Sequence, residues 1–203
     1  MSKNSTLLDI KKQIDIWEIK RKNFVKRFSK FSWKKISTLI SRLGNKDFFL
    51  AVAALTAQQK GPKHEKRLIK IFKGKKVKAK LNKGDFVTKA GKYYEVKCST
   101  PSADGNVLNL VQIRTFQKID YYLCVFIDDV YYKKNYVFLL NKKQMKYECE
   151  TIGNSAHMTS DIVSKTRHRE YRISIFLDKP NSKTTKRWLR DYRNKKLEEK
   201  IFK

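Results

Sequence analysis

The 203-residue sequence has no long apolar segment, because its longest apolar run, FFLAVAAL, covers only residues 48–55. A helix that spans a bilayer needs about 20 predominantly apolar residues. The N-terminus also lacks the apolar core of a secretory signal peptide. These absences predict a soluble, cytoplasmic protein with no membrane partner.

Cysteine is scarce, and two common motifs are missing. Cys98, Cys124 and Cys149 are widely spaced and form neither a CxxC motif nor a Cys/His cluster. They are therefore expected to be reduced, partly buried thiols, and a zinc site is not predicted. Nothing resembles the phosphate-binding pattern G-x-x-x-x-G-K-[ST], so no nucleotide cofactor is expected.

Acidic residues are few relative to basic ones. The chain has 48 Lys and Arg against 19 Asp and Glu, which leaves a formal net charge of +29. Such an excess is typical of a protein that binds a polyanion. Charge alone does not distinguish DNA from RNA or from an anionic membrane surface.

The segment 85–98, DFVTKAGKYYEVKC, predicts a β-hairpin. β-Branched and aromatic residues flank Ala90-Gly91, and a three-residue loop with Gly91 in the left-handed conformation would place Asp85 opposite Glu95. Side chains two apart on a strand share a face, so Glu95 and Lys97 project together while Val96 points into the core. Two carboxylates and an ammonium then share one patch.

This patch suits metal-dependent phosphodiester hydrolysis. Mg²⁺ takes oxygen ligands, keeps several waters and is commonly held by one or two carboxylates plus substrate phosphate, a demand that Asp85 and Glu95 fit. A bound metal makes a water nucleophilic and stabilises charge at phosphorus. Lys97 would orient that water or stabilise the phosphate charge. The alternative is a solvated hairpin in a chain rich in charge.

The pattern of Asp85, nine intervening residues and Glu95-x-Lys97 resembles the PD-(D/E)xK nuclease superfamily, with Gly84 in the place of the family's proline. The resemblance implies catalytic roles for Asp85, Glu95 and Lys97, and a Mg²⁺ held by Asp85, Glu95 and Val96. It also implies a central mixed β-sheet flanked by helices, within the α/β (mixed α+β) class.

Two further segments add to this resemblance. Gly61-Pro62 precedes a helical run in which Glu65 stands where the family often carries an upstream acid, so Glu65 is a further catalytic candidate; the alternative is an ordinary exposed helix residue. Gln117 and Tyr121 have the spacing of the Q-x-x-x-Y element on the helix that follows the ExK strand in some branches. For this pair the alternative is simple packing.

The resemblance is strongest to type II restriction enzymes, which implies a Mg²⁺-dependent, sequence-specific endonuclease that cuts double-stranded DNA as a homodimer. The alternatives are a structure-specific or repair nuclease of the same fold, and a non-catalytic basic nucleic-acid-binding protein. Base-reading residues are expected in the irregular segment 151–172, since Arg and Asn pair well with base edges. The candidates for DNA contact in this segment are Asn154, His157, Arg167 and Arg169, and the alternative is a disordered polar connection. Arg114 and Gln112 are expected to contact the DNA backbone.

Periodicity predicts an N-terminal helical region, 1–60, and a region of mixed helices and strands, 61–203, with a basic C-terminal helix, together one compact domain. The resemblance implies that 61–203 is the nuclease core. Helices are predicted at 5–31, at 33–43, 46–59, 109–120 and 142–150, with a last helix from residue 182 that carries Trp188 and Tyr192 on one side. Continuous apolar runs predict buried strands at 121–127 and 136–140, and a further strand at 172–177.

Overall fold

The computed structural model describes residues 52, 57–78, 82–101, 106–128, 134–155 and 170–202. The helices predicted at 5–31 and 33–43, and most of the one at 46–59, lie outside the described residues. The first regular element of the described part is the helix α4, Ala57–Ile71.

Among the described residues, six strands follow α4 before the next helix, and further helices and strands come after them. The helices after α4 are α5 (Lys142–Ile152), α7 (Lys183–Arg187), the π-helix η2 (Trp188–Tyr192) and α8 (Lys195–Phe202). The strands are β1 (Lys75–Lys76), β2 (Phe86–Val87), β3 (Tyr93–Ser99), β4 (Val107–Arg114), β5 (Tyr121–Phe126), β6 (Tyr136–Asn141), β7 (Asn154–Ser155) and β8 (Glu170–Phe176).

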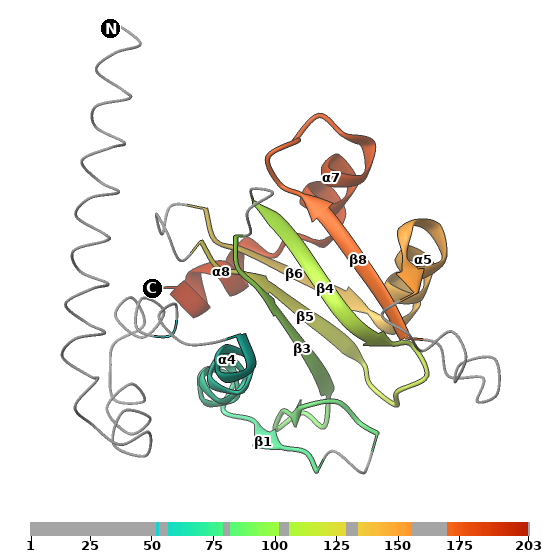
Figure 1. Cartoon of the computed structure of the whole chain (residues 1–203). Helices are drawn as coiled ribbons and strands as arrows, with labels where there is room; N and C mark the ends of the chain where they lie inside the picture. Colours follow the sequence, from blue (N-terminus) through green and yellow to red (C-terminus); the bar gives the residue numbers. More distant parts are fainter. Residues whose placement is uncertain are drawn as a thin grey trace, which may run out of the picture.

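Two sheets organise the fold. The larger has the strand order β1-β2-β3-β5-β6, and its β3–β5 pair is parallel while its other pairs are antiparallel. The smaller is antiparallel, with the order β4-β8-β7. In Figure 1, α4 and α8 lie on one side of the larger sheet, and β4, β8 and α5 lie on the other. The predicted mixed α/β class is confirmed.

Each face of the larger sheet has its own apolar core. Alternate residues of β5 divide between them: Tyr122 and Cys124 pack with β4, β8 and α5, whereas Leu123 and Val125 pack with α4 and α8. β3 is divided in the same way, because Val96 and Cys98 pack against the α4 side. Within the described residues, no helix has the length and apolar character needed to cross a bilayer.

Several predicted elements are confirmed. The apolar runs at 121–127 and 136–140 form β5 and β6, the segment 142–150 forms α5, and the segment 172–177 lies largely in β8. Asn141 caps α5, since its side chain accepts a hydrogen bond from the N–H of Gln144 while the Gln144 side chain accepts one from the N–H of Asn141.

The helix predicted at 109–120 is wrong, because Val107–Arg114 forms the strand β4. Leu108, Leu110 and Ile113 are buried against the larger sheet, and β4 pairs along most of its length with β8. The partner strand lies more than 50 residues away in the sequence, so this pairing is a tertiary effect that local periodicity does not report.

Two helix boundaries also differ from prediction. Gly61-Pro62 does not open a helix, because α4 already includes both residues; Pro62 only removes one N–H donor from the helix. The single C-terminal helix is instead α7, η2 and α8. Arg193 bridges to Phe138 of β6, and Asn194 donates its N–H to the Val137 carbonyl, so the chain leaves the helical path there. Trp188 and Tyr192 do share a buried side.

Candidate active site

The predicted hairpin is confirmed in its loop and its register. Thr88 donates its N–H to the Lys92 carbonyl at 2.9 Å, Gly91 donates to Thr88 at 3.0 Å, and Gly91 has a φ of 73°. The loop is therefore the predicted three-residue turn with a left-handed glycine. Phe86 pairs with Tyr94 in the register that this loop predicts, and Asp85 comes directly before this last pair of β2 and β3.

The backbone conformation of Gly84 explains why this chain has glycine where the family that it resembles has proline. Its φ is +77°, whereas a proline ring fixes φ near −65°. A Cβ at this position would lie 2.5 Å from the Tyr94 carbonyl oxygen. The tight approach lets Asp85 donate its N–H to that same carbonyl at 2.8 Å. Gly84 thus sets the start of the strand that presents Asp85.

Asp85 is held at the edge of β3 beside a second carboxylate. Its Oδ2 accepts a hydrogen bond from the N–H of Val96 at 2.7 Å. Burial and the nearby Glu95 carboxylate raise the pKa of Asp85 to about 6, although the Val96 hydrogen bond opposes the rise. Two negative charges in a partly buried place repel each other, and a cation between them would relieve the repulsion.

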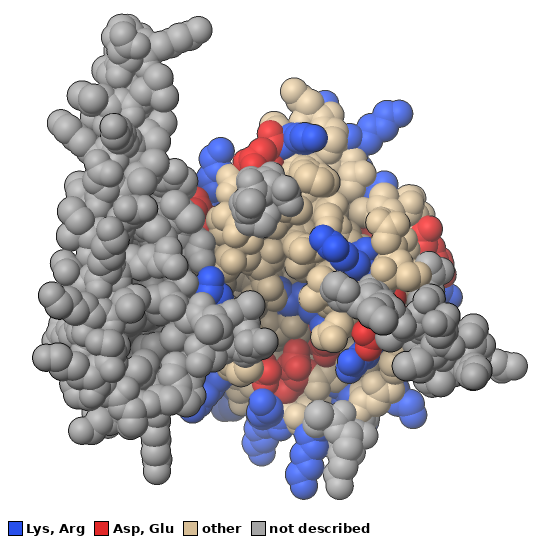
Figure 2. Space-filling model, in the orientation of Figure 1, with Lys and Arg blue, Asp and Glu red and all other residues tan. Residues whose placement is uncertain are grey.

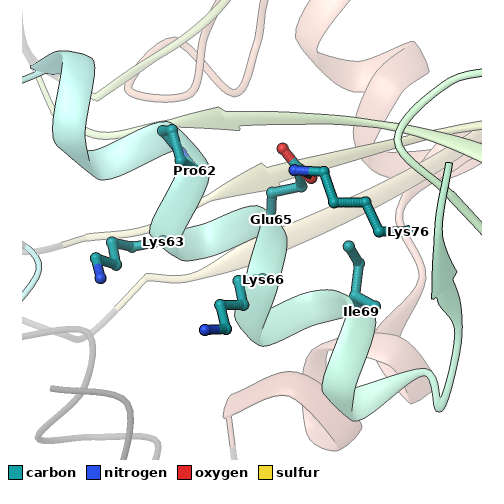
Figure 3. Close-up of a pocket in the computed structure, with 6 residues that line it drawn as sticks. All are labelled: Pro62, Lys63, Glu65, Lys66, Ile69 and Lys76. Atoms are coloured by element: carbon teal, nitrogen blue, oxygen red, sulfur yellow. Dashed lines mark ion pairs between the residues drawn. The ribbon is translucent and has the colours of Figure 1, made fainter. Parts of the chain in front are cut away.

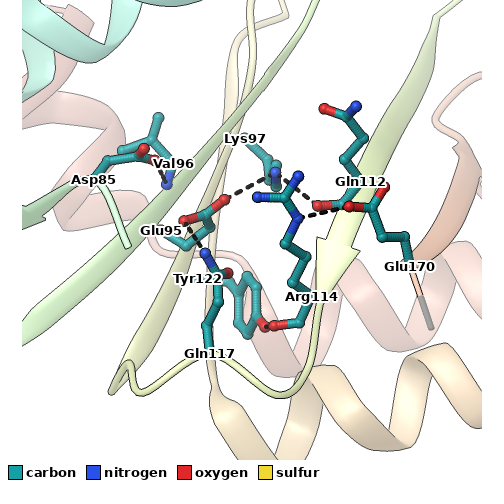
Figure 4. Close-up of polar contacts among 9 residues, drawn as sticks. All are labelled: Asp85, Glu95, Val96, Lys97, Gln112, Arg114, Gln117, Tyr122 and Glu170. Atoms are coloured by element: carbon teal, nitrogen blue, oxygen red, sulfur yellow. Dashed lines mark hydrogen bonds and ion pairs between the residues drawn. The ribbon is translucent and has the colours of Figure 1, made fainter. Parts of the chain in front are cut away.

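Glu95 and Lys97 point to the β4 side of the sheet (Figure 4). The Lys97 Nζ lies 2.9 Å from Glu95 Oε1 and donates to the main-chain carbonyl of Gln112 at 3.1 Å. Gln117 donates its Nε2 to Glu95 Oε2 at 3.3 Å. Glu95 is only 7% exposed, so its carboxylate has a fixed direction. A carboxylate has about four lone-pair positions, so these two donors leave room for a further cation.

Val96 could contribute only its main-chain carbonyl as a ligand, because its side chain is apolar and packs in the α4 core. The N–H and the carbonyl of one residue point to the same side of a strand. Since the Val96 N–H points to Asp85, its carbonyl also points to that side, away from β5. Asp85, Glu95 and Val96, the three residues predicted as metal ligands, therefore lie together at one edge of β3.

Glu65 approaches this edge from α4. It forms an ion pair with Lys76 at 2.9 Å and also contributes to the raised pKa of Asp85. Around this pair lies a surface hollow of about 410 Å³ (Figure 3). Its lining combines three lysines with Glu65 and two apolar residues: Pro62, Lys63, Glu65, Lys66, Ile69 and Lys76. Glu65 is thus near Asp85, and it belongs to α4, on the other side of the larger sheet from β4.

The predicted Q-x-x-x-Y helix is wrong, because Gln117 lies in the turn after β4 and Tyr121 begins β5. Gln117 nevertheless reaches the site, where it contacts Glu95. Tyr121 instead stacks on Tyr94, with ring centroids 5.2 Å apart. The Q-x-x-x-Y pattern therefore pointed to one residue of the site, Gln117, although these residues do not form the predicted helix.

The predicted DNA contacts fall into two groups. His157, Arg167 and Arg169 lie outside the described residues. Among the others, Arg114 pairs with Glu170 at 2.7 Å, and Asn154 is exposed on the short strand β7. Gln112 has an exposed side chain, and its contact with the site is made by its main chain. Sequence reasoning missed that contact and also Lys76, since neither has a local signal.

The donor set fits a hard cation such as Mg²⁺ better than zinc, because it consists of carboxylate and carbonyl oxygens. The described residues contain no group of three or more His, Cys, Asp or Glu side chains arranged to hold a metal. The three cysteines are free, and Cys124 and Cys149 are buried. No protein-family model matches the chain, and comparison with curated proteins gives no significant match.

Proposed function

We propose that the protein is a Mg²⁺-dependent nuclease that hydrolyses phosphodiester bonds in DNA. The observation that carries this proposal is the pair of carboxylates, Asp85 and Glu95, at one strand edge with an anchored ammonium beside them. The raised pKa of Asp85 supports it, because nearby Lys97 does not fully offset the two negative charges. In the resembling PD-(D/E)xK family, this combination of groups performs the reaction.

The residues would divide the work as follows. Asp85, Glu95 and the Val96 carbonyl would hold the ion, which supplies charge stabilisation at phosphorus and activates a water. Gln117 keeps the Glu95 carboxylate in place through its 3.3 Å hydrogen bond. Lys97 has one N–H beyond its two acceptors, and we assign that donor to the attacking water or to a phosphate oxygen.

Charge supports a nucleic acid as the substrate. The formal net charge of +29 is typical of a protein that binds a polyanion. Figure 2 shows acidic side chains gathered low on the visible face with Lys and Arg side chains around them. Lys63, Lys66 and Lys76 in the hollow beside Glu65 are suited to contact the phosphates that flank the cleaved one.

The narrower form of the proposal is a cytoplasmic type II restriction enzyme that acts as a homodimer on a specific sequence in double-stranded DNA. It rests on the resemblance of the Asp85…Glu95-x-Lys97 pattern. A structure-specific or repair nuclease would use the same site. Digestion of unmodified phage DNA with Mg²⁺ distinguishes these forms, because discrete fragments indicate sequence specificity and a smear indicates a less specific nuclease.

A second candidate is a non-catalytic nucleic-acid-binding protein. One observation favours it: both oxygens of Glu95 already accept from side chains, Lys97 and Gln117. In that case Mg²⁺ would leave the DNA intact, while binding would still weaken with salt by a log–log slope of about −0.9 per phosphate contact.

The decisive comparison uses two variants with the same charge change. Asp85→Asn should abolish cleavage and leave DNA binding intact or stronger, because it removes a metal ligand and also a repulsion with phosphate. Asp191→Asn, on η2, should cleave as the wild type does, because Asp191 pairs with Arg190. Cleavage by Asp85→Asn at the wild-type rate would overturn the assignment of the site.

A further inference from the structure

β4 is irregular at the point where it passes the candidate site. Its pairing with β8 shifts register between Leu110 and Ile113, and Gln112 in this bulge has a φ of 53°. A left-handed conformation is uncommon for residues other than glycine, with Asn, Asp and His the usual exceptions. Bulges of this kind are frequent next to active sites, where they redirect individual groups.

The Gln112 side chain does not account for this conformation, because it is exposed. The main chain does have a specific contact: the Gln112 carbonyl accepts from the Lys97 Nζ at 3.1 Å. The flanks of the bulge are fixed, since Leu110 and Ile113 are buried and the Arg114 carbonyl accepts from the Tyr122 hydroxyl at 2.8 Å. The unusual backbone is therefore held from both sides (Figure 4).

We infer that Gln112 is a positioning residue, whose carbonyl in the β4 bulge fixes the Lys97 ammonium for the hydrolysis proposed above. An ammonium has three donors. Glu95 and the Gln112 carbonyl hold two of them from two different strands, so the third has a set direction. Without the Gln112 carbonyl, Glu95, two residues away on the same strand, would be the remaining partner of the Lys97 ammonium among the described residues, and Lys97 would be free to turn about it. This role rests on the proposed function.

Substitutions can test a main-chain role because side chains change the cost of the left-handed conformation. Gln112→Gly and Gln112→Asn tolerate a positive φ, whereas the β-branched side chain of Gln112→Val opposes it. We expect the glycine and asparagine variants to have similar kcat values, above that of the valine variant. The valine variant should lose between about tenfold and a hundredfold in kcat, the cost of a misplaced catalytic group, with KM for DNA within about twofold.

A double variant separates positioning of Lys97 from a general structural effect. In a Lys97→Ala background, Gln112→Val should cause no further loss of kcat, because both changes act through the same ammonium. An equal further loss in that background would overturn the inference, as would equal kcat values for Gln112→Gly and Gln112→Val. If the valine variant does not fold, Gln112→Thr makes the same comparison, because threonine is also β-branched but is polar and suits this exposed position.

A measurement without catalysis keeps this inference distinct from the proposed function. Acetylation of Lys97 by an amine-reactive reagent can be followed by mass spectrometry, with the exposed Lys146 as an internal reference. We expect Lys97 in Gln112→Val to react several-fold faster than in the wild type, and Lys97 in Gln112→Gly to react at the wild-type rate. Equal rates in all three proteins would overturn the positioning role. If the acetylation rates follow this pattern but the protein does not cut DNA, the positioning role stands and the proposed nuclease function is overturned.

Discussion

Two buried glutamates of this protein have opposite surroundings. Glu148 on α5 is fully buried and accepts hydrogen bonds from Arg187 at 2.7 Å, Trp188 at 2.9 Å and Tyr192 at 2.8 Å. Glu95 on β3 is almost as buried, but its donors are Lys97 and Gln117, and its neighbour is another carboxylate, Asp85.

This difference separates a structural acid from a candidate functional one. Glu148 has a cation and two neutral donors, which compensate its charge and tie α5 to α7 and η2. Glu95 adds a second negative charge to a place that already has one. A fold gains nothing from such repulsion, so its presence beside an anchored lysine is typical of a site that binds a cation.

The largest expected effect comes from replacing each of the two glutamates separately by glutamine. Glu148→Gln leaves Arg187 without its counter-charge and should lower the free energy of unfolding by about 3 kcal/mol, because breaking a buried ion pair is costly. Glu95→Gln should change stability by less than about 1 kcal/mol, since it also relieves repulsion with Asp85. It should lower Mg²⁺-dependent cleavage at least about 100-fold, because losing a residue that only orients a metal ligand already costs up to about 100-fold.

Urea unfolding and cleavage assays on both variants check this contrast. Cleavage by Glu148→Gln should match the wild type at temperatures where the variant remains folded. A stability loss at Glu95 as large as that at Glu148 would mean that both glutamates are structural.

The next effect concerns the glycine that sets the Asp85 position. Gly84 and Gly91 both have positive φ, but a Cβ has open space only at Gly91. Gly91→Ala should therefore cost about 1 kcal/mol, the cost of the left-handed conformation alone. Gly84→Ala should cost roughly 1–2 kcal/mol more, because its Cβ meets the Tyr94 carbonyl.

Cleavage by these two variants tests the contrast between the glutamates further. Gly84→Ala displaces Asp85, so Glu95 would become an ordinary partner of Lys97 and Mg²⁺-dependent cleavage should be lost. Gly91→Ala should retain cleavage. Equal stability and equal cleavage for the two alanine variants would contradict the close approach at Gly84.

The last contrast is a pH dependence of stability that is specific to Asp85. Its pKa is near 4 in an unfolded chain and about 6 in the folded protein. The group therefore favours the folded state fully below about pH 4, and this contribution is lost as pH rises through about 6. At roughly 1.4 kcal/mol per pKa unit, the rise from about 4 to about 6 corresponds to at most about 3 kcal/mol, which solvent screening of this partly exposed carboxyl reduces.

Urea unfolding in EDTA between pH 4 and pH 7.5 measures this contribution. The Asp85→Asn protein should lack the fall and should be more stable than the wild type at pH 7. If the free energies of unfolding of the two proteins change with pH in parallel, ionised Asp85 does not destabilise the folded protein.

Local patterns predicted the parts of the site that depend on near neighbours. The alternation of Glu95, Val96 and Lys97 and the loop glycine Gly91 were sufficient for the hairpin, because strand period and turn chemistry are local properties. The β4 strand was missed, since its residues become a strand only by pairing with β8. The Gln112 carbonyl and Lys76 reach the site through that pairing and through the packing of α4, which leave no local pattern.

The division of β3 between two cores has a consequence for how the chain finds its native pairing. A slip of β3 by one residue against β5 would exchange the two faces of the strand. Glu95 and Lys97 would then enter the apolar core under α4, and Val96 and Cys98 would face the polar groups around Gln117. Two ionised side chains forced into an apolar core are far costlier than a cavity or a poor contact. The charged residues of the candidate site thus also exclude the nearest misfolded alignment of the central strand.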